Sequence, residues 1–311
     1  MGDNFCFIVD LVNFEGKLPF EIIPGHWFRR ATYREIRRIK KELYARGTDP
    51  FGYENKFVPT EKEGASWKSV PLPRDEWRYY VISFGGSNDK IMDIEYSANL
   101  LKHDINIGIT FFSGEYGYGV GYNPFITSTF FADQRINTGF KEDMPLESNE
   151  LLEINTNYDT IVNLDKLRYP NISRAISDFH QTKMITNRSI LKVLSYFSII
   201  ECLLTHVPSP SDTIDSLTRQ VSTKMSLLSK LFQRKLDYTL HFPQLPTPEK
   251  AWKKLYSYRS AVAHGGDADF NGEFATLLSR DNIQEFLKES LKLLLLYTLK
   301  EPGFVADLQK C

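Results

Sequence analysis

The chain has 311 residues, which is long enough for two domains that each bury a hydrophobic core. Apolar residues make up 42% of the chain and charged residues 25%, which are the proportions of an ordinary globular protein. The formal net charge is −1, which excludes binding of nucleic acid through overall basicity, so any surface that binds RNA must be a local patch.

Cysteine usage and hydropathy predict a cytoplasmic protein with no membrane partner. Cys6, Cys202 and Cys311 are far apart and form no CxxC or metal-binding spacing, which suits a reducing compartment. The Met-Gly-Asp-Asn start has no basic region before an apolar stretch, so no secretory signal is visible. The apolar run 293–296 is far too short to span a bilayer.

The first half of the chain predicts a mixed α/β domain at residues 1–160. We expect this domain to act as a sensor. Strands are predicted at 5–12, 20–23, 27–28, 77–84 and 105–112, and a helix at 91–102. The segment 47–74 is rich in Gly, Pro, Lys and Glu and predicts a long loop, whereas 123–164 has mixed strand and loop character. The glycines of 114–122 fit neither Walker A nor dinucleotide spacing, so they predict a Gly/Tyr hairpin. No catalytic constellation is visible in this half.

A basic helix is predicted at 33–45, with Thr32 as its N-cap and Glu35 completing a capping box. Its apolar residues recur every three or four positions and form one side. The rest of its surface carries four basic candidates for contacts with RNA phosphates: Arg34, Arg37, Arg38 and Lys41. The alternative is a solvated charged face with no ligand.

From about residue 171 onward the pattern becomes helical, and we assign 161–311 to an all-α domain. Helices are predicted at 173–184, 187–206, 213–236, 249–264 and 281–300. Prolines mark the connections, and Pro248 suits the first turn of its helix. Short links without strand signals favour an up-and-down bundle, so the predicted class is α+β, with the bundle after the mixed α/β domain.

One predicted helix carries an arginine within an apolar stripe. Trp252, Leu255, Arg259 and Val262 recur at i, i+3, i+7 and i+10, which is one helix face. A guanidinium stays charged, so Arg259 must meet a carboxylate, an interface or an anion. Glu201 is likewise a charged residue among apolar ones, in an earlier helix, and also needs a partner. We expect the two side chains to pair, with a solvent-facing Glu201 as the alternative.

The same helix ends near a histidine. His264 lies in its last turn, before a Gly-Gly pair that predicts a helix C-cap. At 100° per residue, His264 lies about 140° around the helix from Arg259, so the two can flank a shared site. A protonated histidine is favoured at a helix C-terminus, which explains many such residues without catalysis. Ser260 and Tyr256 are candidate supporting groups, although Tyr256 also suits the core.

The segment Tyr-Ser-Tyr-Arg-Ser-Ala-Val-Ala-His-Gly at 256–265 resembles the Arg-x4-His motif of HEPN domains, especially the ApeA-like branch of prokaryotic defence and toxin proteins. That branch also carries a Glu within an apolar earlier helix, and Glu201 in the run 198–204 is similar. The resemblance covers the C-terminal half. It implies a homodimer of helical bundles that cleaves RNA at Arg259 and His264, with no metal and no cofactor, although HEPN domains without nuclease activity also exist.

The reaction that the resemblance implies is transesterification within RNA. The ribose 2′-hydroxyl attacks the adjacent phosphorus and the 5′-oxygen leaves, which gives a 2′,3′-cyclic phosphate. His264 would shuttle protons and Arg259 would stabilise charge on the phosphorane oxygens. Two copies facing across a two-fold axis would supply two of each group, which favours a homodimer. The other histidines have no partner at metal-ligand spacing, so no metal site is expected.

Two alternatives stay open. The helical domain can be a non-catalytic module for dimerisation, or for binding RNA or a ligand, in which Arg259 is structural and the first half senses a ligand. An enzyme with its site in the first half is the weaker alternative. A basic open groove that contains both Arg259 and His264 would favour the nuclease, and an Arg259 sealed inside with Glu201 would favour the module.

Overall fold

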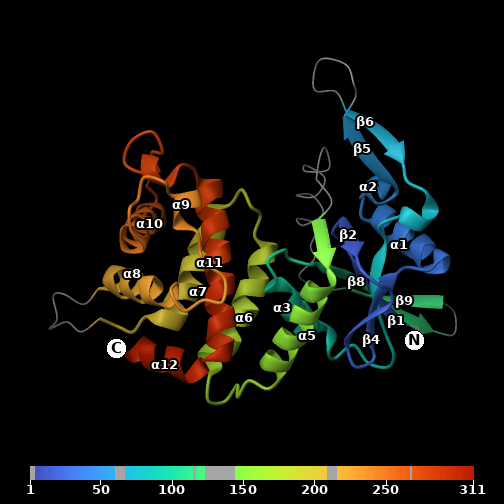
Figure 1. The fold of residues 1–311 in the computed structure, drawn as a ribbon, viewed down its shortest axis with the longest axis horizontal. Helices are drawn as coiled ribbons and strands as arrows, with labels where there is room; N and C mark the ends of the chain where they lie inside the picture. Colours follow the sequence, from blue (N-terminus) through green and yellow to red (C-terminus); the bar gives the residue numbers. More distant parts are fainter. Residues whose placement is uncertain (1–3, 60–66, 115–116, 123–143, 209–215, 267) are drawn as a thin grey trace. The chain divides into compact units, whose positions relative to one another are not determined.

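The computed structural model describes residues 4–59, 67–114, 117–122, 144–208, 216–266 and 268–311. The chain falls into two compact units, 1–158 and 159–311 (Figure 1). The strands of the described residues all lie in the first unit, and the second unit is helical. The predicted α+β class is therefore confirmed at the level of a β-rich first part and a helical second part.

The first unit is built on a six-stranded antiparallel sheet with the strand order β3–β4–β7–β1–β8–β9. Its strands are β1 (Asn4–Ile8), β3 (Phe20–Ile23), β4 (His26–Arg30), β7 (Tyr80–Phe84), β8 (Ile107–Gly114) and β9 (Gly117–Tyr122). Strand β1 is central and pairs with β7 and β8, which come much later in the chain. The pairing of β8 with β9 confirms the predicted hairpin, whose residues 115–116 lie outside the described ranges.

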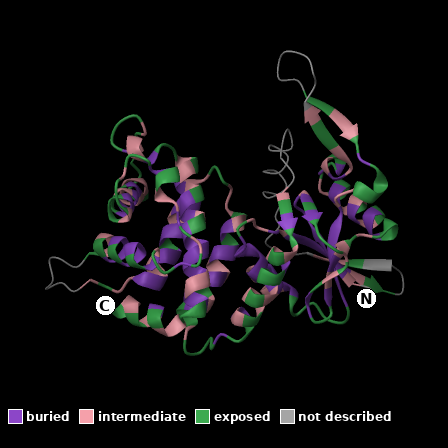
Figure 2. Ribbon diagram, in the orientation of Figure 1, coloured by how far each residue is buried: buried purple, intermediate pink, exposed green. Residues whose placement is uncertain are grey.

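Apolar cores lie on both faces of this sheet. The helical elements of the first unit are α1 (Tyr33–Ala45), α2 (Phe51–Glu54), η1 (Arg74–Glu76), α3 (Ile91–Asn99) and most of α5 (Ser148–Val162). Side chains alternate along β1, so Phe5 and Phe7 join one core and Cys6 and Ile8 join the other. Helix α1 supplies apolar residues to the first core, and α3 and α5 supply them to the second. The central strands are accordingly buried along their length (Figure 2).

Two small ladders complete the first unit. Strand β2 (Val12–Glu15) pairs in parallel with β10 (Met144–Glu147), and β5 (Asn55–Pro59) pairs antiparallel with β6 (Trp67–Pro71). The predicted loop at 47–74 is therefore wrong at 51–59 and 67–71, whereas 47–50 and 72–73 are turn or coil and 60–66 lie outside the described residues. The side chains of β6 are exposed or half-buried throughout, so this hairpin lacks the buried alternating face that identifies a strand.

The predicted mixture of strand and loop at 123–164 is also wrong over most of its described part. Residues 123–143 lie outside the described ranges, and the helix α5 occupies 148–162. Its residues Leu151, Ile154 and Ile161 are buried at i, i+3 and i+10, which is the helical period. Polar residues between them obscure this period in the sequence.

Several predicted elements are shorter in the structure. The predicted strand 5–12 divides into β1 and β2, and Asp10, between them, accepts a hydrogen bond from Asn106 Nδ2 at 2.9 Å. The predicted strand at 77–84 begins only at Tyr80, and the predicted helix at 91–102 ends at Asn99. Such shifts at element ends are ordinary, since terminal residues lack part of the hydrogen-bonding pattern.

Helix α1 begins and ends where the sequence predicts, and its capping box is present. The Glu35 amide donates to Thr32 Oγ1 at 3.4 Å, and the Thr32 amide donates to Glu35 Oε2 at 2.6 Å. Arg29 of β4 donates two further hydrogen bonds to the Glu35 carboxylate, at 2.7 and 2.8 Å. Burial alone would raise the pKa of Glu35, but the hydrogen bonds from Arg29 and Thr32 hold it below its usual value. Glu35 therefore fastens the start of α1 to the sheet.

The second unit surrounds one apolar helix. Its elements are α6 (Pro170–Gln181), η2 (Thr182–Met184), α7 (Ile190–Leu204), α8 (Leu217–Leu228), α9 (Tyr238–His241), α10 (Pro248–Ala263), η3 (Ala275–Leu277), α11 (Arg280–Lys300) and α12 (Pro302–Lys310). Helix α7 contacts α6, α8, α10, α11 and α12, and both α7 and α11 are buried along much of their length (Figure 2). Among the described residues, no helix is both long enough and apolar enough to cross a membrane.

Two helix predictions in this unit need correction. The helix predicted at 213–236 is only α8, since 213–215 lie outside the described residues and turns follow Leu228. Helix α12 is missing from the prediction, because its apolar residues lie within the five positions 304–308, a run too short to reveal a helical period. Its position directly after α11, with Pro302 in the first turn, is typical of a new helix that starts after a break.

Candidate functional site

The candidate site lies where α10 rises from the core to the surface. Thr247 caps the helix by accepting a hydrogen bond from the Lys250 amide at 3.3 Å, and Pro248 occupies the first turn. Along the predicted apolar stripe, Trp252 and Leu255 are fully buried. Arg259 and Val262, further along the same stripe, are only partly buried. The predicted apolar stripe is therefore buried in the first half of the helix and reaches the surface at Arg259 and Val262.

The expected contact between Glu201 and Arg259 is confirmed. Arg259 Nη2 donates to Glu201 Oε2 at 3.2 Å, and Arg259 Nε lies 3.2 Å from Oε1, close enough for charge attraction but without hydrogen-bond alignment. The Glu201 side chain is 17% exposed and that of Arg259 is 30% exposed. The ion pair is thus half-buried, with a solvent path to the guanidinium.

Tyr256 is the third member of this cluster. Its hydroxyl donates to Glu201 Oε1 at 2.9 Å, and the Arg259 Cζ lies 5.6 Å from the centre of its ring. Phe197 of α7 packs on Tyr256, with the planes of the two rings almost perpendicular. Burial and the hydrogen bond to the Glu201 carboxylate raise the pKa of Tyr256 above its usual value. Tyr256 therefore stays protonated and acts as a donor that helps to fix the carboxylate.

Besides the poorly aligned Nε, a second nitrogen of Arg259 donates no hydrogen bond to a described residue. The Nη1 atom has no hydrogen-bond acceptor among the described residues, whereas Nη2 is held by Glu201. A guanidinium has five donor hydrogens in a rigid fork, so one edge can bind a carboxylate while another meets an oxyanion. Glu201 and Tyr256 can therefore orient Arg259 toward a ligand rather than merely neutralise it.

His264 is the C-cap of α10, and the predicted Gly-Gly cap is present. Gly265 has φ +76°, and its amide donates to Val262 O at 3.2 Å while the Gly266 amide donates to Ala261 O at 2.9 Å. These two hydrogen bonds form a Schellman motif. The His264 side chain is exposed and forms no hydrogen bond or ion pair with any described residue.

The predicted site residues are therefore brought together in part. Glu201, Tyr256 and Arg259 form one hydrogen-bonded cluster, whereas His264 and Ser260 make no side-chain contact with it among the described residues. Ser260 is half-buried, and its carbonyl accepts the His264 amide at 3.2 Å. Within one chain, the structure supplies an oriented arginine and, further along the same helix, a separate exposed histidine.

The other predicted RNA-binding residues lie on α1 of the first unit. Arg34, Arg37 and Lys41 are exposed, and Arg38 forms an ion pair with Glu42 at 3.3 Å. Arg37 and Lys41 have no ion pair with any described residue. Two of these four predicted residues therefore remain available to an anion.

A pocket of about 540 Å³ opens beside the end of α10. Gly265 and Gly266 line one side of it, and Arg280 of α11 lines another. Arg280 is already engaged, because its Nη1 donates to Arg188 O at 2.8 Å. Neither Arg259 nor His264 lines this pocket, so it adjoins the motif without containing it.

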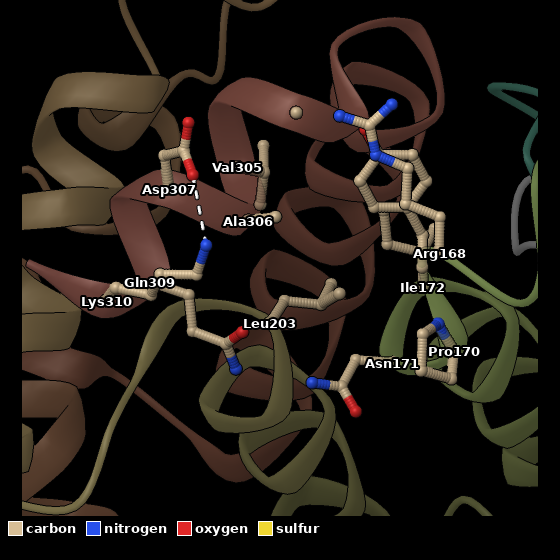
Figure 3. A pocket seen from close by; sticks show the side chains of 12 residues that line it. Arg168, Pro170, Asn171, Ile172, Leu203, Val305, Ala306, Asp307, Gln309 and Lys310 are labelled. Atoms are coloured by element: carbon tan, nitrogen blue, oxygen red, sulfur yellow. Dashed lines mark hydrogen bonds and ion pairs between the residues drawn. The ribbon is translucent and has the colours of Figure 1, made fainter.

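A second pocket, of about 380 Å³, lies among the start of α6, the end of α7 and α12 (Figure 3). Asp307 and Lys310 form an exposed ion pair at 3.2 Å there. Gln309 donates to Cys202 O at 2.7 Å and so fastens α12 to α7. Its lining residues include no histidine, cysteine or serine, and we therefore regard this pocket as a packing feature.

Sequence reasoning missed one contact of the residue that follows Glu201. Arg174 of α6 donates from Nη2 to Cys202 Sγ at 2.8 Å, directly beside Glu201 in the chain. Nothing in the sequence pairs Arg174 with Cys202, because the contact depends on how α6 lies against α7. Among the described residues, no group of three or more His, Cys, Asp or Glu side chains could hold a metal ion.

Comparison with known proteins gives no match: no family model, curated protein or solved structure is similar to this chain. The function must therefore be argued from the geometry of the site and from the resemblance carried by the Arg259–His264 segment.

Proposed function

We propose that the helical unit is an endoribonuclease of the HEPN type that cleaves RNA by transesterification and needs no metal, in antiviral defence or as a toxin. The main support for the proposal is that the Arg259 guanidinium is both held in place and accessible to solvent. Its guanidinium is oriented by Glu201 and supported by Tyr256, yet it keeps a solvent path and an Nη1 without a partner among the described residues. That open edge is available to an oxygen of a phosphate group.

Each group has a chemical task in this proposal. Arg259 Nη1 would donate to a non-bridging oxygen of the scissile phosphate and stabilise the charge that grows there in the transition state. His264 would move protons, taking one from the 2′-hydroxyl or giving one to the departing 5′-oxygen. The 2′-oxygen bonds to phosphorus as the phosphorus–5′-oxygen bond breaks, so the products end in a 2′,3′-cyclic phosphate and a 5′-hydroxyl.

The proposal includes a homodimer. Arg259 and His264 have no mutual contact within one chain, and one of each is few for a reaction that needs both a base and an acid. A two-fold axis beside the end of α10 would place the histidine of one copy near the arginine of the other. The exposure of residues 263–266 leaves this end of the helix accessible to such a partner.

The test is cleavage of a defined RNA by wild-type protein and by Arg259→Ala and His264→Ala variants. We expect each variant to lose about 10²–10³-fold in rate with its circular dichroism spectrum unchanged. EDTA should leave the rate unchanged, and the 3′ ends should be cyclic phosphates. An equal mixture of the two variants should recover part of the activity if the site is shared between copies. Cleavage that requires added magnesium, or that survives His264→Ala, would refute the mechanism.

The same ion pair also favours a second function, in which Arg259 has a structural role. Glu201 already neutralises Arg259, and Tyr256 covers part of the guanidinium, as expected of a structural pair in a non-catalytic module for dimerisation or ligand binding. In that case Arg259→Ala would lower stability, whereas His264→Ala would change neither stability nor any RNA-dependent property. The two functions therefore make opposite predictions for His264.

A further inference from the structure

The exposed face of α1 combines aromatic rings with cations in one row. Tyr33, Arg37, Lys40, Lys41 and Tyr44 recur at i, i+4, i+7, i+8 and i+11, which places them along one side of the helix. Tyr33 is 60% exposed and Tyr44 is 58% exposed, which is unusual for two large rings on one short helix. The adjacent face of the helix carries the residues that pack on the sheet.

A second element turns this row into a groove. Arg74 of η1 and the following Trp77 lie opposite α1, and together they line a pocket of about 420 Å³ whose floor includes Ile36. The Arg74 guanidinium lies 5.6 Å from the Tyr33 ring centre and 5.8 Å from that of Trp77. The groove therefore alternates aromatic faces with positive charge.

The charge of the groove is mostly uncompensated. Lys40 is paired with Glu54 at 2.7 Å, but Arg37 and Lys41 have no ion pair with any described residue. The pocket lining contains four cations and no acidic residue. Asp75 and Glu76 follow Arg74 in the chain and are exposed, yet they do not line the pocket.

We infer that this groove, made of Tyr33, Arg37, Lys41, Tyr44, Arg74 and Trp77, binds single-stranded RNA. Cations placed along a groove follow a phosphate backbone, and exposed rings between them stack on unpaired bases, which is how proteins hold single strands. A duplex hides its base faces and would leave the rings unused. An acidic peptide would use the cations only. The inference rests on the proposed function for the choice of RNA, and it adds the first unit as a means of holding the strand.

The test measures binding separately from cleavage. The probe is a fluorescent single strand of about 12 nucleotides with 2′-O-methyl riboses, which lack the attacking hydroxyl and cannot be cleaved by transesterification. Binding to the full-length protein is followed by fluorescence anisotropy. We expect Arg37→Glu combined with Lys41→Glu to weaken binding at least about tenfold and to reduce the salt dependence by about 0.7 in log–log slope per lost phosphate contact.

Matched variants separate stacking from charge. Tyr33→Ala should weaken binding about tenfold, since stacking on an exposed ring is sequence-tolerant and substantial, whereas Tyr33→Phe keeps the ring and should bind like wild type. Lys17→Glu removes an exposed cation of the same unit outside the groove and should have little effect. Because Tyr33 and Lys41 are exposed, none of these changes should unfold the protein.

Each contrary outcome identifies a different error. Equal binding of a duplex of the same sequence would exclude base stacking and overturn the inference. Competition by a polyglutamate peptide, together with unchanged binding by Tyr33→Ala, would assign the groove to an acidic protein partner instead. Wild-type affinity in the Arg37→Glu/Lys41→Glu protein would place RNA elsewhere. A protein that binds the probe but cleaves no RNA would retain this inference while refuting the proposed nuclease.

Discussion

The Tyr256 hydroxyl and the Glu201 carboxylate are joined by a hydrogen bond of 2.9 Å that ties α10 to α7. The same carboxylate holds Arg259, so one acidic group of the central helix fixes two side chains of the helix that carries the motif. Glu201 therefore stabilises the fold and also orients the candidate site, so a substitution of Glu201 should affect both stability and the site. Suitable variants can separate the two contributions.

The free energy of unfolding should reveal how much this cluster stabilises the fold. Glu201→Ala leaves Arg259 and Tyr256 without their acceptor, and we expect it to cost about 1–3 kcal/mol, as for lost hydrogen bonds to a charged group. The partial exposure of Arg259 keeps the loss below that of a fully buried pair. Tyr256→Phe removes one hydrogen bond and should cost about 1 kcal/mol. Urea unfolding measures both, and a double variant no worse than Glu201→Ala alone would show that Tyr256 acts through Glu201.

Replacing Arg259 with lysine tests whether the guanidinium fork matters. One ammonium keeps the positive charge but cannot hold Glu201 at one edge while it presents a second, fixed donor to phosphate. We expect Arg259→Lys to retain most of the stability and to lose about 10²-fold in RNA cleavage, as when one charge-stabilising donor is removed. Cleavage by Arg259→Lys at the wild-type rate would indicate that only net charge is needed at this position.

Acid should destabilise the helical unit through His180. This side chain is 1% exposed, and burial, with the nearby Lys183, lowers its pKa from 6.5 to about 3. At pH values between these two pKa values, His180 is protonated in the unfolded chain but neutral in the folded chain. The stabilisation is therefore complete above about pH 6.5 and falls by about 1.4 kcal/mol per pH unit toward pH 3. In His180→Phe the free energy of unfolding should fall less steeply with decreasing pH, by about 1.4 kcal/mol per pH unit, whatever the stability of the variant at neutral pH.

The glycine cap of α10 offers a further test of the geometry. Gly265 has φ +76°, and a methyl group there would meet no atom within 4 Å. The expected cost of Gly265→Ala, about 1 kcal/mol, is therefore backbone strain alone. Gly265→Asn should be less costly, because asparagine adopts left-handed backbone more readily. Equal thermal midpoints for wild type and the alanine variant would contradict a left-handed residue at this position.

Local chemistry made some features predictable. The capping box of α1 and the glycine cap of α10 depend on residues adjacent in sequence, so their geometry follows from residue type. The pairing of Glu201 with Arg259 was predictable for another reason. Two charges in apolar helices must find partners, and each was the best candidate for the other.

Other features depend on tertiary packing and could not be predicted. The exposure of Arg259 depends on where α10 leaves the core, which its apolar stripe does not show. The β5–β6 hairpin buries neither face against the sheet, so its residues carry no strand period. The aromatic row on α1 is visible in the sequence as Tyr33 and Tyr44, but its meaning depends on Arg74 and Trp77, which the fold brings to it.

The central place of β1 has a consequence for biosynthesis. Phe5 pairs with Ser83 on one side and with Phe111 on the other, so the strand made first can complete its hydrogen bonds only after residue 111 has left the ribosome. Strand β7 can cover one edge of β1 earlier, but the edge that pairs with β8 stays open to other chains until then. A nascent chain halted before β8 should therefore aggregate or recruit chaperones.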